Sequence, residues 1–189
     1  LSCASNQLTA LELSKLTELT KLACEGNQLT VLELGTLTQL QTLDCSGNQL
    51  TTLDVSAQKQ LETLRCMENH LIALDVTGLS KLQQGEVIDN TRSIPFNAMG
   101  QVDLSALADG FQPSKVQPDM WQNATCTENV LTVNDRSQEI RYAYQIDAGD
   151  ASRTVSFTWI PTVMEEDAVA IDTEHFPDDV LRSLSLIHI

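Results

Sequence analysis

The sequence predicts a solenoid of stacked parallel β-strands followed by a small β-rich domain. One 21-residue phrase is written four times between Leu1 and Gln84, and a fixed period of this length is typical of proteins built from stacked repeats. From Gln101 onward this period is lost, and short segments alternate apolar and polar residues as half-buried strands do. We expect a solenoid over residues 1–90, a β-rich, sandwich-like cap over residues 91–163 and an acidic linker over residues 164–189.

The repeated phrase reads L-x-C-x-x-N-x-L-x-x-L-x-L/V. Apolar residues two apart point to the same side of an extended chain, so Leu22 and Cys24 are expected to face the core from a first strand. The pair Leu32 and Leu34 predicts a second strand in the same coil. The first leucine of the phrase recurs at Leu1, Leu22, Leu43 and Leu64.

The signature of the leucine-rich repeat is matched by Leu19-x-x-Leu22-x-Cys24-x-x-Asn27-x-Leu29, and the same phrase recurs from Leu40 and Leu61. A second L-x-x-L-x-L half a coil later is similar to the nested pattern of short bacterial repeats of the IRREKO type. This resemblance covers the first 84 residues. It implies a secreted or cell-surface bacterial protein whose curved solenoid binds other macromolecules, and it does not imply an enzyme. We expect no enzyme activity and no cofactor.

An asparagine keeps step with the phrase, at the turn that follows the first strand. There its amide can bond backbone groups that a tight turn leaves unpaired, so we interpret the series as a structural ladder. A row of ligand-reading amides is the alternative. The ladder residues are Asn6, Asn27, Asn48 and Asn69.

Four cysteines also keep step, and parallel strands about 4.8 Å apart would hold their thiols in a column. A disulfide needs side chains that converge, and a zinc site needs four ligands that close around the ion. We therefore interpret these residues as buried free thiols and predict no metal site. The column is Cys3, Cys24, Cys45 and Cys66, with Cys126 outside the repeats.

The outward positions of the first strand differ from coil to coil, and we expect a recognition surface there. A purely structural face could vary in the same way. The expected partner is a protein or a glycan, because solenoids present extended concave surfaces to macromolecules. The candidate residues are Lys21, Ala23, Glu25, Thr42, Asp44, Ser46, Thr63, Arg65 and Met67.

A carboxylate recurs on the outward side of the expected second strand, at Glu12, Glu33, Asp54 and Asp75. A solvated acidic edge is one interpretation, and a calcium-binding ladder is the other. Calcium needs several oxygens that converge from different directions, so the solvated edge is favoured.

The β-rich region is expected to cover the open end of the solenoid, where the last coil would otherwise expose leucines and a strand edge. The fifth phrase decays, and residues Glu86 to Asp89 are expected to form the last solenoid strand. An aromatic core is expected from Trp121, Trp159 and their neighbours. The predicted strands are Val102–Leu104, Val130–Val133, Ile140–Ile146 and Thr154–Ile160.

The formal charge of −15 and a pI near 4.3 disfavour binding to nucleic acid or to an anionic membrane surface. No apolar run approaches the roughly 18 residues that span a bilayer, so no membrane insertion is expected. No set of side chains suggests catalysis, and there is no glycine-rich phosphate loop. The sequence does not indicate an oligomeric state.

We interpret the chain as a fragment, because Leu1 enters in mid-repeat without a signal peptide. Near the other end, Phe176-Pro177-Asp178 resembles the start of the cap that opens many bacterial leucine-rich repeat arrays, and little weight is given to Ser185 onward. The predicted function is a non-catalytic, macromolecule-binding module located outside the cell or on its surface. The alternatives are a structural spacer, or the recognition arm of an enzyme whose catalytic domain lies elsewhere.

Overall fold

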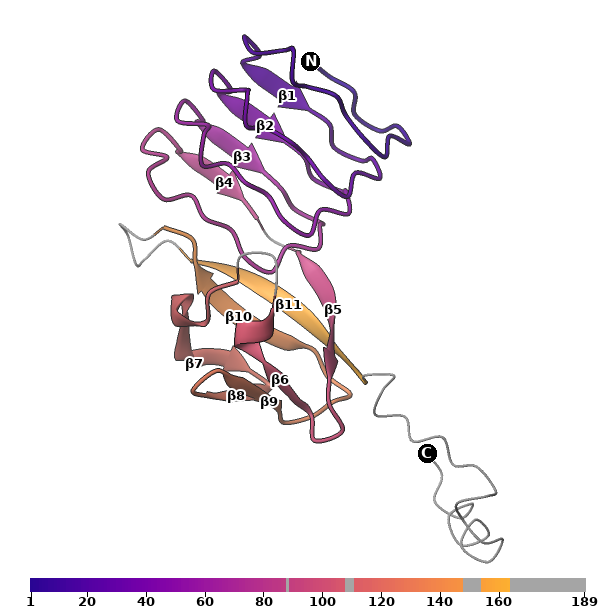
Figure 1. Cartoon of the computed structure of the whole chain (residues 1–189), viewed down its shortest axis with the longest axis vertical. Coiled ribbons are helices and arrows are strands. Elements are labelled where there is room, and N and C mark those ends of the chain that lie inside the picture. The colour runs from indigo at the N-terminus through magenta and orange to yellow at the C-terminus, as the bar shows by residue number, and fades with distance from the viewer. Residues whose placement is uncertain (88, 108–110, 148–153, 164–189) are drawn as a thin grey trace, which may run out of the picture.

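The computed structural model describes residues 1–87, 89–107, 111–147 and 154–163. The first part is a stack of coils joined by one parallel sheet, in the strand order β1-β2-β3-β4 (Figure 1). Register partners such as Lys21, Thr42 and Thr63 lie 21 residues apart, so each coil contributes one strand. The strands are β1 (Lys21–Ala23), β2 (Thr42–Asp44), β3 (Thr63–Arg65) and β4 (Gln84–Glu86).

The inward positions of these strands form the core of the solenoid. Leu22, Leu43 and Leu64 are buried at the strand centres, and the cysteines that follow β1, β2 and β3 are fully buried. This agrees with the predicted alternation of the first strand. The last strand was expected at Glu86–Asp89, but β4 is Gln84–Glu86 because it keeps the 21-residue register with Thr63–Arg65.

The expected second strand is wrong. Leu32–Leu34 belongs to no strand and leads into two successive turns, in which Leu37 N donates to Leu34 O (2.8 Å) and Leu40 N to Leu37 O (3.1 Å). These two turns return the chain to the start of β2. Leucines three apart therefore face the core from turns.

The second part holds two further sheets. One has the order β5-β11-β10-β7, with β5 parallel to β11 and the other pairs antiparallel; the second has the antiparallel order β6-β9-β8. The strands are β5 (Thr91–Phe96), β6 (Gln101–Asp103), β7 (Val116–Gln122), β8 (Ala124–Thr127), β9 (Val130–Val133), β10 (Ile140–Gln145) and β11 (Thr154–Val163), with 3-10 turns η1 (Leu104–Ala106) and η2 (Pro113–Lys115).

Four of these strands lie where the sequence predicts strands, namely β6, β9, β10 and β11, whereas β5, β7 and β8 were not predicted. The predicted alternation of β10 is confirmed, because Ile140, Tyr142 and Tyr144 are buried and Arg141 is exposed. The expected linker over residues 164–189 lies outside the described residues.

The core of the second part is aromatic. The ring centroid of Tyr142 lies 4.8 Å from that of Trp159 and 4.9 Å from that of Trp121, and Phe111 lies 5.4 Å from Trp159. The first 95 residues contain no Phe, Trp or Tyr. The two parts therefore have chemically different cores.

Backbone hydrogen bonds continue from the solenoid into the second part. Within the solenoid, the residues after Asn27, Asn48 and Asn69 donate to the preceding coil, as Gln49 N does to Leu29 O (2.9 Å). Thr91 N at the start of β5 also bonds the fourth coil, with Asn69 O as its acceptor (3.1 Å). Thr158 N of β11 then donates to Asn90 O (3.1 Å), so β11 takes the place of a further coil. None of the described helices has the length and apolar character needed to cross a membrane.

Candidate binding surfaces

The ladder asparagines join successive coils through their side chains. Asn48 Nδ2 lies within hydrogen-bond distance of three carbonyl oxygens, those of Cys24 (3.0 Å), Cys45 (3.0 Å) and Ser46 (3.2 Å). Asn48 Oδ1 accepts from Leu29 N (3.0 Å). The amide therefore spans two coils, and its two hydrogens are already shared among backbone acceptors.

Asn27 and Asn69 make the equivalent contacts, each to its own coil and to the preceding coil. Asn90 belongs to the series too, since it bonds Cys66 O, Val87 O and Leu71 N. Asn6 is exposed and reaches only Cys3 O and Ala4 O of its own coil. The buried asparagine amides donate their hydrogens to backbone carbonyls, so they have no amide hydrogen left to offer a ligand.

The cysteine column consists of free thiols. Each thiol of the first three coils lies near a carbonyl of the next coil, as Cys45 Sγ does to Arg65 O (3.4 Å). Burial raises the pKa of Cys24 and of Cys66 to about 12, and nearby acidic groups add to the shift. These thiols are neutral near pH 7. Among the described residues, no group of three or more His, Cys, Asp or Glu side chains could hold a metal ion.

The acidic column caps turns. Glu12, Asp54 and Asp75 each accept from the backbone N–H two residues later, at Ser14 (3.0 Å), Ser56 (2.9 Å) and Thr77 (2.9 Å). Hydrogen bonds from Ser14 and Ser56 lower the pKa of Glu12 and of Asp54. Their predicted position on a second strand is wrong, because Glu12, Asp54 and Asp75 each accept at the start of a turn and Glu33 lies in no strand.

The candidate recognition residues lie together on the outward side of the first sheet, which we call the sheet face. Strand register places Lys21, Thr42 and Thr63 in one column and Ala23, Asp44 and Arg65 in the next. Ladder bonds from Gly26 N to Ser46 O and from Gly47 N to Met67 O (both 2.9 Å) continue the stack beyond the strands. All of the predicted residues, which also include Glu25, are exposed or half-buried.

The sheet face is polar and close to neutral. Arg65 Nη1 lies 3.9 Å from Asp44 Oδ2, and the Arg65 side chain keeps 45% of its surface exposed. Glu25 Oε2 and Ser46 Oγ are buried atoms without a hydrogen-bond partner in the described part of the chain. The predicted set carries two acids and two bases, so an overall charge would not select its partner.

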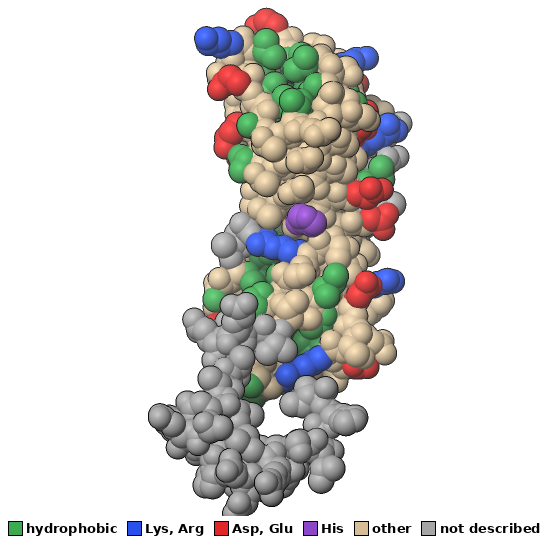
Figure 2. All heavy atoms as spheres, turned by 90° about the vertical axis from the view of Figure 1, so that its right-hand side faces the viewer, with side chains coloured by type: hydrophobic (Ala, Val, Ile, Leu, Met, Phe, Trp, Pro, Cys, Tyr) green, Lys and Arg blue, Asp and Glu red, His purple; other side chains and the backbone are tan. Residues whose placement is uncertain are grey.

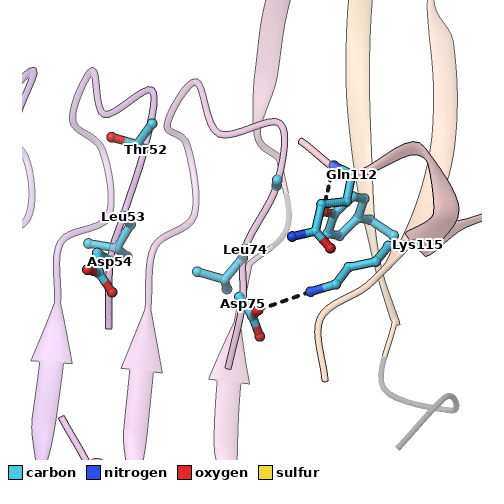
Figure 3. A pocket seen from close by; sticks show the side chains of 9 residues that line it. Thr52, Leu53, Asp54, Leu74, Asp75, Gln112 and Lys115 are labelled. Atoms are coloured by element: carbon cyan, nitrogen blue, oxygen red, sulfur yellow. Dashed lines mark hydrogen bonds and ion pairs between the residues drawn. The ribbon is translucent and has the colours of Figure 1, made fainter. Parts of the chain in front are cut away.

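A depression that we call the junction groove lies between the solenoid and the second part. Its volume is about 290 Å³, and Figure 3 shows Lys115 and Gln112 of the second part facing Asp75 of the fourth coil. Sequence reasoning missed this groove because its two walls are far apart in the chain. The walls are Thr52, Leu53, Asp54, Ala73, Leu74 and Asp75 on the solenoid, and Gln112, Lys115 and Tyr144 on the second part.

The end of the solenoid nearest to Leu1 exposes apolar side chains. Leu16 is 41% exposed, whereas its equivalent Leu37 in the next coil is fully buried. Figure 2 shows hydrophobic side chains gathered at this end, with acidic side chains along the edges of the solenoid. Basic side chains also lie along these edges in this view.

The proteins similar to this chain include two solved structures, and one stretch of the chain matches a repeat family. The functional domain of InlJ from Listeria monocytogenes, described as including a cysteine ladder, is 19% identical with a TM-score of 0.38. The crystal structure of InlP from the same organism is 21% identical with a TM-score of 0.46. Each comparison covers 86% of this chain and 52% of the other, so this chain spans about half the length of these structures.

No curated protein matches this chain in sequence. Residues 17–58 match a family described as Leucine Rich repeats (2 copies). The matched stretch contains β1, β2 and two ladder asparagines, which the structure places in successive coils. Residues 17–58 are therefore similar to leucine-rich repeats in sequence, and the structure arranges them as successive coils.

Proposed function

We propose that this chain is a non-catalytic binding module that works outside the cell, and that its sheet face recognises a partner protein. The observation that carries the proposal is the separation of core and surface in β1, β2 and β3. The inward leucines and cysteines hold the stack, while the outward positions differ from coil to coil and remain accessible. Substitution on the sheet face can therefore change recognition while the core is retained.

A protein partner is favoured over a glycan by the chemistry of this face. Sugar rings are commonly held against the flat face of Phe, Trp or Tyr, and residues 1–95 contain none of these three. The sheet face instead presents both signs of charge, from Lys21, Glu25, Asp44 and Arg65. Alternating charges of this kind suit a partner with a complementary polar surface.

Arg65 is the residue that we expect to contribute most to binding. Arginine is enriched among the side chains that dominate interface energies, because its planar guanidinium makes several directed hydrogen bonds. Arg65 lies on β3 in the column with Ala23 and Asp44, and Met67 follows it two residues later in the chain. A partner carboxylate would compete with Asp44 for the guanidinium, and Met67 would pack against apolar surface nearby.

The spacer function is the second candidate, and one observation favours it. The hydrogen bonds from Thr91 N to Asn69 O and from Thr158 N to Asn90 O join the solenoid directly to the second part. A chain joined in this way is suited to holding another domain at a fixed distance. Rigidity of this kind is compatible with recognition through the sheet face.

Photo-crosslinking tests the proposal. A photoreactive amino acid is placed at Thr42 or Thr63 on the sheet face, and at the exposed Thr30 outside it as the matched control. Each variant is mixed with secreted and cell-surface protein fractions, and adducts are identified by mass spectrometry. The proposal expects one protein to be captured from Thr42 and Thr63 and absent from Thr30. Capture of the same protein equally from Thr30, or no adduct from the sheet face, would argue against it.

A further inference from the structure

The junction groove has walls that are fixed before any ligand arrives. Lys115 Nζ lies 3.1 Å from Asp75 Oδ2 and bridges the two walls. Beside this ion pair, Val76 N donates to Ile146 O (2.8 Å) and Tyr142 Oη donates to Ile72 O (2.7 Å). These bonds join the fourth coil to β10 and its end, so the shape of the groove does not depend on a loop closing over it.

The floor of the groove is apolar and its solenoid side is acidic. Leu53, Leu74 and Tyr144 are buried with little exposed surface, and Ala73 is half-buried beside them. The Asp75 carboxylate is paired with Lys115, whereas Asp54 on the adjacent coil is exposed and forms no ion pair with any described residue. The groove therefore carries one uncompensated negative charge above an apolar surface.

These features select the class of ligand. The volume of about 290 Å³ lies at the lower end of ligand sites, so it fits a single side chain better than a large cofactor. An apolar floor suits a methylene stem, and the unpaired carboxylate suits a cationic head. Lysine and arginine combine these two properties in one side chain. The overall charge of −15 also attracts cationic segments and repels anionic ones.

We infer that the junction groove binds a lysine or arginine side chain of an extended basic segment in a partner polypeptide, with its stem on Leu74 and Tyr144 and its head at Asp54. The flank of the solenoid allows the segment to continue. Another depression, of about 380 Å³, lies along the first two coils and is lined by Glu12 and Glu33 among others. Further basic residues of the same segment would meet the remaining carboxylates of the column. This site is separate from the sheet face and does not depend on it.

The probe for this inference is a fluorescein-labelled octapeptide that alternates lysine and serine, titrated against the full chain by fluorescence anisotropy. A peptide of the same length with norleucine in place of lysine keeps the stem and removes the charge. Two variants address the groove. Asp54→Asn removes the unpaired charge and keeps an oxygen for the Ser56 turn, and Thr52→Trp fills the groove without changing charge.

The matched control is Glu18→Gln, which removes one exposed carboxylate from the first coil. We expect the lysine peptide to bind more tightly than the norleucine peptide, and each groove variant to weaken it by about threefold to tenfold, the range expected for one partly exposed ion pair with its stem contacts. Glu18→Gln should leave the affinity unchanged. Equal losses from Glu18→Gln and Asp54→Asn, or no loss from Thr52→Trp, would overturn the inference, because attraction would then be general and independent of the groove.

Discussion

The phenol of Tyr142 donates a hydrogen bond to the backbone carbonyl of Ile72 at 2.7 Å, and this contact joins the aromatic core of the second part to the fourth coil of the solenoid. Both residues are almost completely buried, so water cannot replace the bond if it is lost. Burial also raises the pKa of Tyr142 well above its ordinary value, so the phenol keeps its proton. The junction thus contains a polar contact inside an apolar core.

Tyr142→Phe is expected to destabilise the junction by about 1–3 kcal/mol, because the Ile72 carbonyl loses a buried donor. Hydrogen exchange at Val76 N, which bonds Ile146 O across the same boundary, measures the effect. Tyr144→Phe is the matched control, since its hydroxyl accepts from Gln112 N within the second part. Faster exchange at Val76 in both variants alike would show that the Tyr142 bond has no special role.

Asn48→Ala is expected to lower the free energy of unfolding by about 1–3 kcal/mol, because Leu29 N and the surrounding carbonyls lose their shared partner. Asn6→Ala is the control, because its amide is exposed and bonds only its own coil. Urea unfolding of the two variants makes the comparison. A loss at Asn6 as large as the loss at Asn48 would contradict the role assigned to bonds between coils.

Gln58→Leu is expected to stabilise the solenoid. Gln58 is fully buried at the position held by Leu37 and Leu79 in neighbouring coils, and its Oε1 has no partner in the described part of the chain. Its Nε2 donates to Leu34 O, but that carbonyl also accepts from Leu37 N and stays paired after the change. We expect a gain of about 1 kcal/mol, measured as a higher urea midpoint. A lower midpoint would mean that the amide holds the turn in place.

Stability is expected to fall at alkaline pH through the buried thiols. The pKa of Cys24 and Cys66 is about 12 in the folded chain, against about 8.5 for an unfolded cysteine. Above pH 8.5 the unfolded state releases these protons first, so the stabilisation is complete below that pH and is lost as the pH rises towards 12. Urea midpoints between pH 7.5 and 10 should decline less steeply in the Cys24→Ala/Cys66→Ala variant. Parallel declines would contradict this origin.

The first strand of each coil could be predicted because two periods agree there. Residues such as Leu22 and Cys24 repeat every 21 positions and also alternate with outward residues, and both signals reflect the same buried column. The second half of the coil was misread because Leu32 and Leu34 fit an extended segment whether or not it pairs. Leu37 and Leu40 continue at a spacing of three, which was the available signal for turns.

The second part was harder to predict for a different reason. The missed strands β5 and β7 contain Pro95 and Pro118, and proline argues against a strand in the interior of a sheet. Both strands lie at the edges of their sheet, where a missing backbone donor is tolerated. The junction groove could not be predicted at all, since the ion pair between Asp75 and Lys115 joins residues 40 positions apart.

The most direct test of the sheet face uses the purified partner from the crosslinking experiment. It measures how tightly that partner binds variants of this chain. Arg65→Glu reverses a charge on this face, and Lys59→Glu makes the same change at an exposed residue in a turn of the third coil. Calorimetric titration of both variants, each with an unchanged urea midpoint, is expected to show at least about a tenfold loss for Arg65→Glu, as for an interface residue that dominates binding. Lys59→Glu is expected to bind as the unaltered chain does. Unchanged affinity in Arg65→Glu, or an equal loss in Lys59→Glu, would contradict recognition through the sheet face.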